Sequence, residues 1–256
     1  MILRRIKSHI EKENWFAVWI DFCIVVVGVF LGIQVANWNE EQSRKAQENS
    51  YLVLLHEELG QNAERSARLL DYYTTVTEAG ERALDFLKGD EACKNACEGL
   101  LIDFFHASQL WAITFSQTAF RESIELGFPS DNALREQLLA TYDLTNSFGM
   151  LNQIPPPFRE AVRGYIEPSA ARILWSGCWE VNVTVVTETL TRNCAERLKD
   201  VDTAGMLREI RSDSRLDGML RYWLNQNIVA MQNYPTVRDR SIETADMVAV
   251  VIEMTR

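Results

Sequence analysis

The residues best suited to chemistry are Cys93, Cys97, Cys178 and Cys194, since Cys23 lies inside an apolar run near the N-terminus. An even number of cysteines beyond an apolar segment is typical of disulfides in an oxidising compartment. Four thiols allow three pairings, which the sequence does not distinguish, and we favour the local pairs Cys93–Cys97 and Cys178–Cys194. Cysteines four apart bridge poorly on a regular helix, so the first pair requires a distorted turn.

Candidates for metal binding or catalysis are few. The chain has three histidines, His9, His56 and His106. The spacing Cys-x3-Cys-x8-His that ends at His106 matches no common zinc pattern, and no Gly-x-Ser-x-Gly elbow, P-loop or dinucleotide fingerprint occurs. Adjacent acids such as Glu57 and Glu58 usually belong to a solvated helix face. We therefore predict no catalytic residue, metal site or cofactor, and no enzymatic activity.

The elements that position these residues begin with an apolar run from Trp15 to Trp38. As far as Ala36 only Asp21 and Gln34 are strongly polar, and the length is close to the roughly 20 residues that cross a bilayer. The terminal tryptophans suit the two membrane interfaces. The run predicts a transmembrane helix over residues 15–38, with the lipid bilayer as its surroundings.

Flanking charges predict the orientation. After the run the first basic residues are only Arg44 and Lys45, whereas four precede it: Arg4, Arg5, Lys7 and Lys12. The positive-inside rule then makes residues 1–14 a cytoplasmic tail. A cleaved signal peptide is the alternative, and we favour an uncleaved anchor because Gln34 occupies the upstream position of the small-x-small site.

Three small residues, Gly28, Gly32 and Ala36, share one face of this helix. Such a face allows two helices to approach closely, although small residues are common in membrane helices in general. It predicts a helix–helix contact in a homo-oligomer or with a membrane-protein partner. Asp21 is expected to reach the cytoplasmic interface or to pair with a basic residue of another helix.

The formal net charge of −10 limits the partners. Nucleic acid requires a basic footprint, which this chain lacks, so we predict no nucleic-acid binding. An acidic domain is also repelled by anionic headgroups. Solubility alone accounts for much of such a charge.

Helical patterns dominate the remainder, and we predict a mainly α fold. Residues 39–88 are expected to continue the membrane helix as a stalk or first bundle helix, with eight of eleven positions at 3,4 spacing apolar. The positions are Leu52, Leu55, Leu59, Asn62, Ser66, Leu69, Tyr73, Val76, Gly80, Ala83 and Leu87. The three exceptions, Asn62, Ser66 and Gly80, favour one helix of an antiparallel bundle over a two-stranded coiled coil.

Residues 89–256 are predicted to be a helical domain. One helix is expected over 100–126, ended by Gly127, with Ser130 or Asp131 capping the next helix. A further helix follows residues 155–157, three consecutive prolines. Two helices separated by a turn at residues 233–235 end the chain. Alternating valines within 176–195 resemble a strand without an identified partner, so that region stays unassigned.

Several blocks together resemble a known family. The residues are Asp21, Val25-Val26-Val27-Gly28, Gly32, Gln34 and Asn37-Trp38-Asn39-Glu40-Glu41, followed by Phe120 to Gly127, Asn132 to Arg135 and Tyr142. They are similar to a family of single-pass bacterial envelope proteins of unknown function. The resemblance implies a bacterial inner-membrane protein with a helical periplasmic domain, and it implies no activity, cofactor or catalytic residue.

These observations lead to a first functional hypothesis, a non-enzymatic, membrane-anchored periplasmic interaction protein. The alternative is a ligand-sensing helical bundle that modulates a transporter or kinase, with a pocket formed by Trp111, Trp175, Trp179 and Trp223. A hydrolase is third, and it requires acid and base groups clustered in a cleft.

Overall fold

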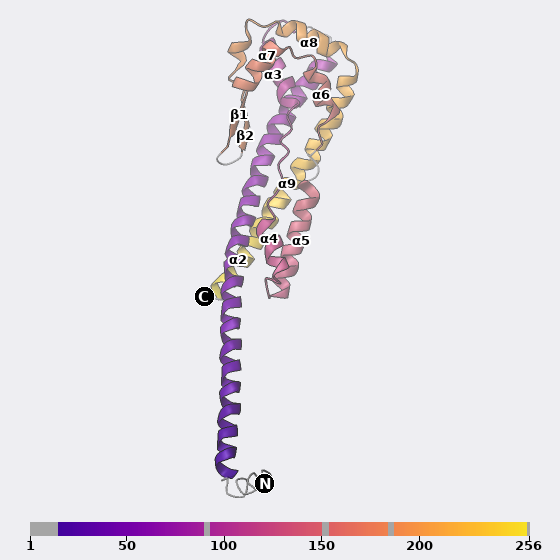
Figure 1. Cartoon of the computed structure of the whole chain (residues 1–256). Coiled ribbons are helices and arrows are strands. Elements are labelled where there is room, and N and C mark those ends of the chain that lie inside the picture. Colours follow the sequence, from indigo (N-terminus) through magenta and orange to yellow (C-terminus); the bar gives the residue numbers. More distant parts are fainter. Residues whose placement is uncertain (1–14, 90–92, 150–153, 184–186, 255–256) are drawn as a thin grey trace, which may run out of the picture. The chain divides into compact units, whose positions relative to one another are not determined.

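The computed structural model describes residues 15–89, 93–149, 154–183 and 187–254, and it is mainly helical (Figure 1). The predicted tail, residues 1–14, lies outside the described residues. The chain divides into two compact units, Met1–Tyr51 and Leu52–Arg256, and we call the second unit the helical domain. The elements in order are α2 (Trp15–Lys88), α3 (Cys97–Ala107), α4 (Thr118–Glu125), α5 (Asn132–Gly149), α6 (Pro157–Arg163), α7 (Pro168–Gly177), β1 (Trp179–Asn182), β2 (Thr187–Leu190), the 3-10 helix η1 (Ala195–Leu198), α8 (Thr203–Ser212) and α9 (Arg215–Met254).

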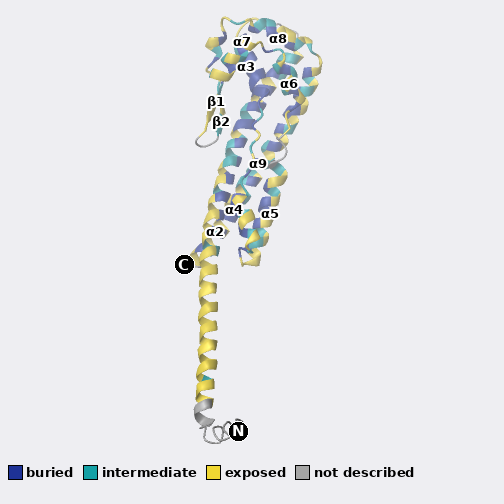
Figure 2. Cartoon of the chain, viewed as in Figure 1, coloured by how far each residue is buried: buried dark blue, intermediate teal, exposed yellow. Residues whose placement is uncertain are grey.

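The first unit contains the N-terminal part of α2. Its large apolar side chains from Trp19 to Trp38 are exposed (Figure 2). This helix is long and apolar enough to cross a membrane, which is compatible with a single-pass membrane protein. An exposed apolar surface of this extent is unfavourable in water, so the segment needs an apolar environment.

Within the helical domain, the 3,4 pattern of α2 marks its buried face. Each of the three exceptions to the apolar pattern contacts a specific residue elsewhere in the domain. The hydroxyl of Ser66 donates to the Tyr234 carbonyl at 2.6 Å, and a Cβ at Gly80 would lie 2.5 Å from a methyl carbon of Leu224. Asn62 binds a segment described below. Ser66 contacts Tyr234, and Gly80, further along α2, contacts Leu224, which comes earlier on α9. The two helices therefore pack antiparallel.

Two apolar cores lie in this domain. One joins α2, α4, α5 and α9 through residues that include Leu55, Leu138 and Val248. The larger core gathers α2 and α9 with α3, α6, α7 and α8, and Phe104 and Phe158 are fully buried in it. Burial of this apolar surface is the main favourable contribution to folding.

The helix predicted over residues 100–126 is wrong. The structure has two helices, α3 and α4, with extended chain over residues 109–117 between them. Trp111 belongs to the larger core and Ala119 to the smaller one. Extended chain covers about 3.3 Å per residue against 1.5 Å in a helix, so it connects the two cores with few residues.

The turn between α4 and α5 agrees with its prediction. Gly127 has a φ of 79°, the left-handed conformation that favours glycine at a helix end. Asp131, one of the two expected caps, accepts a hydrogen bond from the Leu134 N–H at 2.8 Å.

The turn predicted at residues 233–235 is also wrong, because α9 is continuous and contains Pro235. Tyr234 and Val237 on either side are buried. Packing against α2 therefore outweighs the cost of a proline inside the helix.

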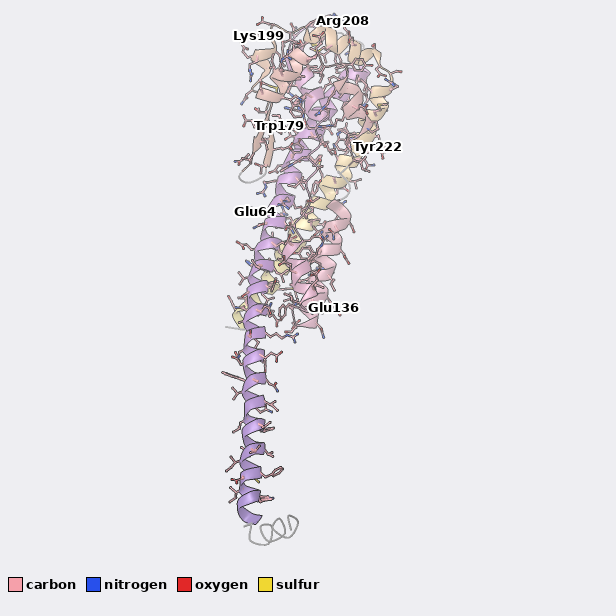
Figure 3. All side chains as sticks on the ribbon, in the orientation of Figure 1. Glu64, Glu136, Trp179, Lys199, Arg208 and Tyr222 are labelled. Carbon is pink, nitrogen blue, oxygen red and sulfur yellow. A yellow bond between two sulfur atoms is a disulfide. The ribbon has the colours of Figure 1, made fainter. Side chains whose placement is uncertain are left out.

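Residues 179–190 form an antiparallel hairpin, with Trp179 opposite Leu190. The strand unassigned in the sequence thus pairs with the chain that follows it, beyond residues 184–186, which lie outside the described residues. Trp179 is the first residue of β1 (Figure 3). Its indole N–H donates to Glu188 at 3.0 Å, and Tyr72 of α2 donates to the same carboxylate at 3.1 Å.

Both favoured cysteine pairs lie at disulfide distance. The Cα–Cα separations are 5.7 Å for Cys93–Cys97 and 5.3 Å for Cys178–Cys194. Cys97 is the first residue of α3, and Ala96 before it has a φ of 55°. The distorted turn that the first pair requires therefore lies just before the helix.

Candidate functional site

The extended segment 109–117 lies along α2, which holds it with polar side chains. The backbone N–H of Trp111 donates to the Tyr73 hydroxyl at 3.2 Å, and this hydroxyl donates to the Trp111 carbonyl at 3.3 Å. About two turns further toward the N-terminus of α2, the Arg65 guanidinium donates to the Thr114 carbonyl at 2.6 Å. Side chains of a helix thus satisfy backbone groups that have no partner in secondary structure.

Asn62 binds Ser116 as a neighbouring strand would. Its Oδ1 accepts from the Ser116 N–H at 2.9 Å, and its Nδ2 donates to the Ser116 carbonyl at 2.8 Å. Since α2 numbers fall from 73 to 62 while segment numbers rise from 111 to 116, the segment runs antiparallel to α2.

Glu58 completes this row on α2. Its carboxylate accepts from the Ser116 hydroxyl at 2.8 Å, the N–H groups of Ala119 and Phe120 at 3.0 and 3.2 Å, and the Tyr142 hydroxyl at 2.7 Å. These two N–H groups have no acceptor within α4 because they lie in its first turn, where a nearby negative charge is favourable. Glu58 therefore fixes the start of α4 to both α2 and α5.

The prediction of a solvated face at Glu57 and Glu58 is wrong for Glu58, which is buried, whereas Glu57 is exposed. Burial raises the pKa of Tyr142, and its hydrogen bond to Glu58 raises it further. The ring of Tyr142 stacks on Phe120 with centroids 4.1 Å apart. These contacts give Glu58 a structural role.

Part of the segment's backbone has no hydrogen-bond partner among the described residues. Among the described residues, the backbone N–H and C=O groups of Ala112 and Phe115 form no hydrogen bond. The segment is not a regular strand, because the Ile113 N–H donates to the Trp111 carbonyl at 3.1 Å and so makes a tight turn at Ala112.

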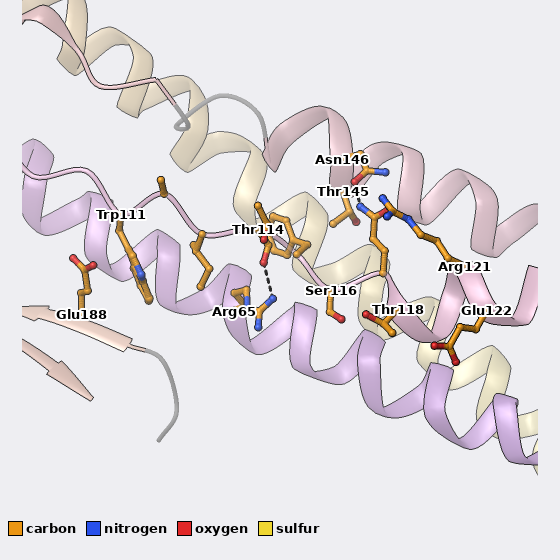
Figure 4. A pocket seen from close by; sticks show the side chains of 14 residues that line it. Arg65, Trp111, Thr114, Ser116, Thr118, Arg121, Glu122, Thr145, Asn146 and Glu188 are labelled. Carbon is orange, nitrogen blue, oxygen red and sulfur yellow. Dashed lines mark hydrogen bonds between the residues drawn. The ribbon is translucent and has the colours of Figure 1, made fainter. Parts of the chain in front are cut away.

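The segment lines an open groove of about 1220 Å³. Glu188 and Trp111 lie toward one end of it and Arg121 and Glu122 toward the other, with Asn146 of α5 on one wall (Figure 4). The full lining is Arg65, Trp111, Ala112, Ile113, Thr114, Phe115, Ser116, Gln117, Thr118, Arg121, Glu122, Thr145, Asn146 and Glu188.

The charges of the groove balance, with two arginines and two glutamates in the lining. Burial lowers the pKa of Arg65, and the nearby Arg68 lowers it further. The side-chain amide of Gln117 donates to Asn146 of α5 and accepts from Arg121 of α4. The site offers many hydrogen-bonding groups and no dominant charge.

The four tryptophans do not share one pocket. Trp111 lines the groove, while Trp223 is buried and donates to the Ala107 carbonyl at 2.9 Å. Trp175 and Trp179 contact each other edge to face, 5.3 Å between centroids. The prediction of a common tryptophan-lined pocket is therefore not supported by these positions.

The other predicted site residues lie elsewhere. A Cβ at Gly28 or Gly32 would meet nothing within 4 Å in this single chain, so their helix–helix contact stays a prediction. His106 places Nε2 3.0 Å from the Cys178 carbonyl. The described part of the chain contains no group of three or more His, Cys, Asp or Glu side chains arranged for a metal ion.

Comparisons of this chain with models of protein families, with curated proteins and with solved structures find no match.

Sequence reasoning missed the groove, although one signal was present. Asn62 interrupts an apolar helix face, and a buried amide requires hydrogen-bond partners. The sequence does not show that those partners are the backbone of Ser116, more than fifty residues away.

Proposed function

We propose that the chain is a membrane-anchored, non-enzymatic interaction protein that binds an extended segment of a partner protein in the groove. The observation that carries this proposal is the set of backbone groups of Ala112 and Phe115 that have no hydrogen-bond partner among the described residues and line the open groove. An extended peptide can pair with such groups and gain affinity from main-chain hydrogen bonds.

The form of the groove favours a peptide over a small molecule. Pockets for small molecules are usually enclosed and mostly apolar, with few polar groups. This groove is open and carries hydroxyl, amide and charged side chains along its length. Alternate side chains of a bound strand would contact these groups and provide specificity.

The apolar helix, the basic residues before it and the two cysteine pairs support a location. We propose a bacterial inner-membrane protein with residues 1–14 in the cytoplasm and the helical domain in the periplasm, as the family resemblance implies. A reporter that functions only outside the cytoplasm, fused after Arg256, should be active. Activity only of a cytoplasmic reporter would contradict this orientation.

A photo-crosslinking amino acid tests the groove directly. Placed at Ala112 in the full-length protein in native membranes, it should yield a crosslinked protein. Ala112 is exposed, and so is Arg172 on α7, outside the groove lining, which serves as the control position. Bands at both positions or at neither, with the variants folded, would reject the groove as the binding site.

The membrane helix offers a second contact. If Gly28 and Gly32 meet a partner helix, Gly28→Ile or Gly32→Ile should weaken association by about 1–2 kcal/mol, because a β-branched side chain keeps the backbones apart. Leu31→Ile, on another face, is the control. Equal signals from all three variants in a membrane two-hybrid assay would show that the glycine face is incidental.

The alternative function, ligand sensing for a transporter or kinase, is favoured by a different observation, a second pocket formed by α2, α3 and the chain at and after β2. Purification of the full-length protein with its membrane partners would separate the two functions, since only the alternative requires a transporter or kinase.

A further inference from the structure

The second pocket has a volume of about 460 Å³ and shares no residue with the groove. It is lined by Thr75, Glu78, Arg82, His106, Leu190 and Arg192. The first three are on one face of α2, at i, i+3 and i+7. One wall of the pocket therefore carries a hydroxyl, a carboxylate and a guanidinium group, in this order along α2.

Its basic end is formed around a buried carboxylate. Asp103 Oδ1 accepts from Arg82 Nε at 3.1 Å and Nη2 at 2.9 Å, and also from Arg192 Nη1. Arg192 Nη2 donates to the Gly99 carbonyl at 3.2 Å. Two guanidinium groups share one carboxylate, so these three groups together carry one positive charge.

Unused donors accompany that charge. Within the described ranges, Arg82 Nη1 and Arg192 Nε have no hydrogen-bond partner. Both side chains are about half exposed, at 45% and 47%, while that of Asp103 is buried. A carboxylate entering the pocket would find paired N–H donors held in position by Asp103.

The other end of the pocket accepts hydrogen bonds. Thr75 Oγ1 donates its proton to the Asp71 carbonyl at 3.2 Å, so its lone pairs remain for a donor. Glu78 is exposed and has no ion pair or hydrogen bond in the described part of the chain. An ammonium group fits such acceptors.

The remaining walls carry no charge. Burial lowers the pKa of His106 to about 4, so its ring is neutral near pH 7. Its Nε2 lies 3.0 Å from the Cys178 carbonyl, which fixes the ring. Leu190 adds an apolar surface. The formal charges of Arg82, Arg192, Asp103 and Glu78 sum to zero, and Glu78 lies one turn of α2 before Arg82, with which it interacts electrostatically.

We propose that this pocket binds a free α-amino acid as a zwitterion. The ligand carboxylate would pair with Arg82 and Arg192, the ammonium group with Glu78 and Thr75, and the side chain would lie along Leu190. A pocket without net charge but with two poles complements a zwitterion better than a simple anion or cation. This proposal does not depend on peptide binding in the groove.

Isothermal titration of the full-length protein in detergent micelles with the common L-amino acids tests the proposal. We expect binding of at least one of them. Its N-acetyl derivative lacks the ammonium group and its amide lacks the carboxylate, so each should bind at least about tenfold more weakly, as expected for loss of a charge-assisted interaction.

Variants locate the ligand. Arg192→Gln and Glu78→Gln should each weaken binding by about tenfold or more, whereas Arg172→Gln and Glu57→Gln, at exposed positions outside the pocket, should not. Circular dichroism confirms that the variants are folded. The proposal is overturned if no amino acid binds at millimolar concentration, if the N-acetyl derivative binds equally, or if Arg192→Gln and Glu78→Gln bind like the parent protein.

Discussion

Glu58 and Asp103 are both buried carboxylates on helices of the same domain, and their partners differ in kind. Glu58 accepts hydrogen bonds from neutral donors, two of which are backbone N–H groups at the start of α4. Asp103 is bound by Arg82 and Arg192, whose side chains are about half exposed.

The difference distinguishes a carboxylate that holds helices together from a carboxylate that positions groups able to bind a ligand. Backbone N–H groups of a packed helix cannot turn toward water when their acceptor is lost, so Glu58 is required for the position of α4. Exposed guanidinium groups keep donors for other acceptors and can be rehydrated. Asp103 therefore holds Arg82 and Arg192 in place while leaving them able to bind a ligand.

The largest effect is expected for Glu58→Ala. It leaves donors of Ala119, Phe120 and Tyr142 without an acceptor and creates a small cavity, so the free energy of unfolding should fall by about 4 kcal/mol. Denaturant unfolding of the full-length protein in detergent micelles measures this change.

The neighbouring Glu57 provides a matched control. It is exposed on the same turn of α2, and Glu57→Ala should change the free energy of unfolding by less than about 0.5 kcal/mol. Equal effects of the two substitutions would mean that helix propensity, and not the bonds to α4, determines the result.

Local patterns predict much of the fold. The 3,4 spacing of apolar residues identifies α2 and its buried face, while Gly127 and Asp131 identify the turn between α4 and α5. The spacing of the cysteines favours the two pairs that the structure has at disulfide distance. Each of these features depends on residues close in sequence.

Features that depend on distant residues were missed. Residues 109–117 are extended because Tyr73, Arg65 and Asn62 bind their backbone, and no local pattern reveals these bonds. Pro235 remains helical because α9 packs on α2. Tertiary contacts override local preference in both cases.

The candidate sites were less predictable than the fold. Glu58 reads as a solvated acid beside Glu57 until α4 and α5 are placed around it. Likewise, Asp103, Arg82 and Arg192 come from three separate elements, so nothing in their spacing shows that they meet.

The pH dependence of stability provides a further prediction at His106, which lies near Asp103, Arg82 and Arg192. Its pKa is about 4 in the folded protein, mainly through burial, against about 6.5 in the unfolded chain. The unfolded chain binds the proton first, so stability present above pH 6.5 is lost as the pH falls toward 4. The loss should be about 3 kcal/mol.

Substitution of the histidine isolates this contribution. Subtracting the pH profile of His106→Gln from that of the parent protein removes the effect of the carboxylates, which titrate in the same range. His56→Gln, at an exposed position, is the control for the substitution itself. A difference profile that is flat between pH 6.5 and 4 would contradict a buried, neutral His106.

Apart from the control substitutions, the smallest effect is expected for Asp103→Asn, although it removes the charge that two arginines share. Breaking a fully buried ion pair costs about 3–5 kcal/mol, and exposed pairs contribute at most about 1 kcal/mol. Arg82 and Arg192 lie between these limits because they can turn toward water, so the free energy of unfolding should fall by about 2 kcal/mol, half the loss expected at Glu58. Denaturant unfolding under the same conditions measures it. A loss equal to that of Glu58→Ala would show that both arginines are as fixed as the backbone of α4, and the distinction between an architectural and a binding carboxylate would fail.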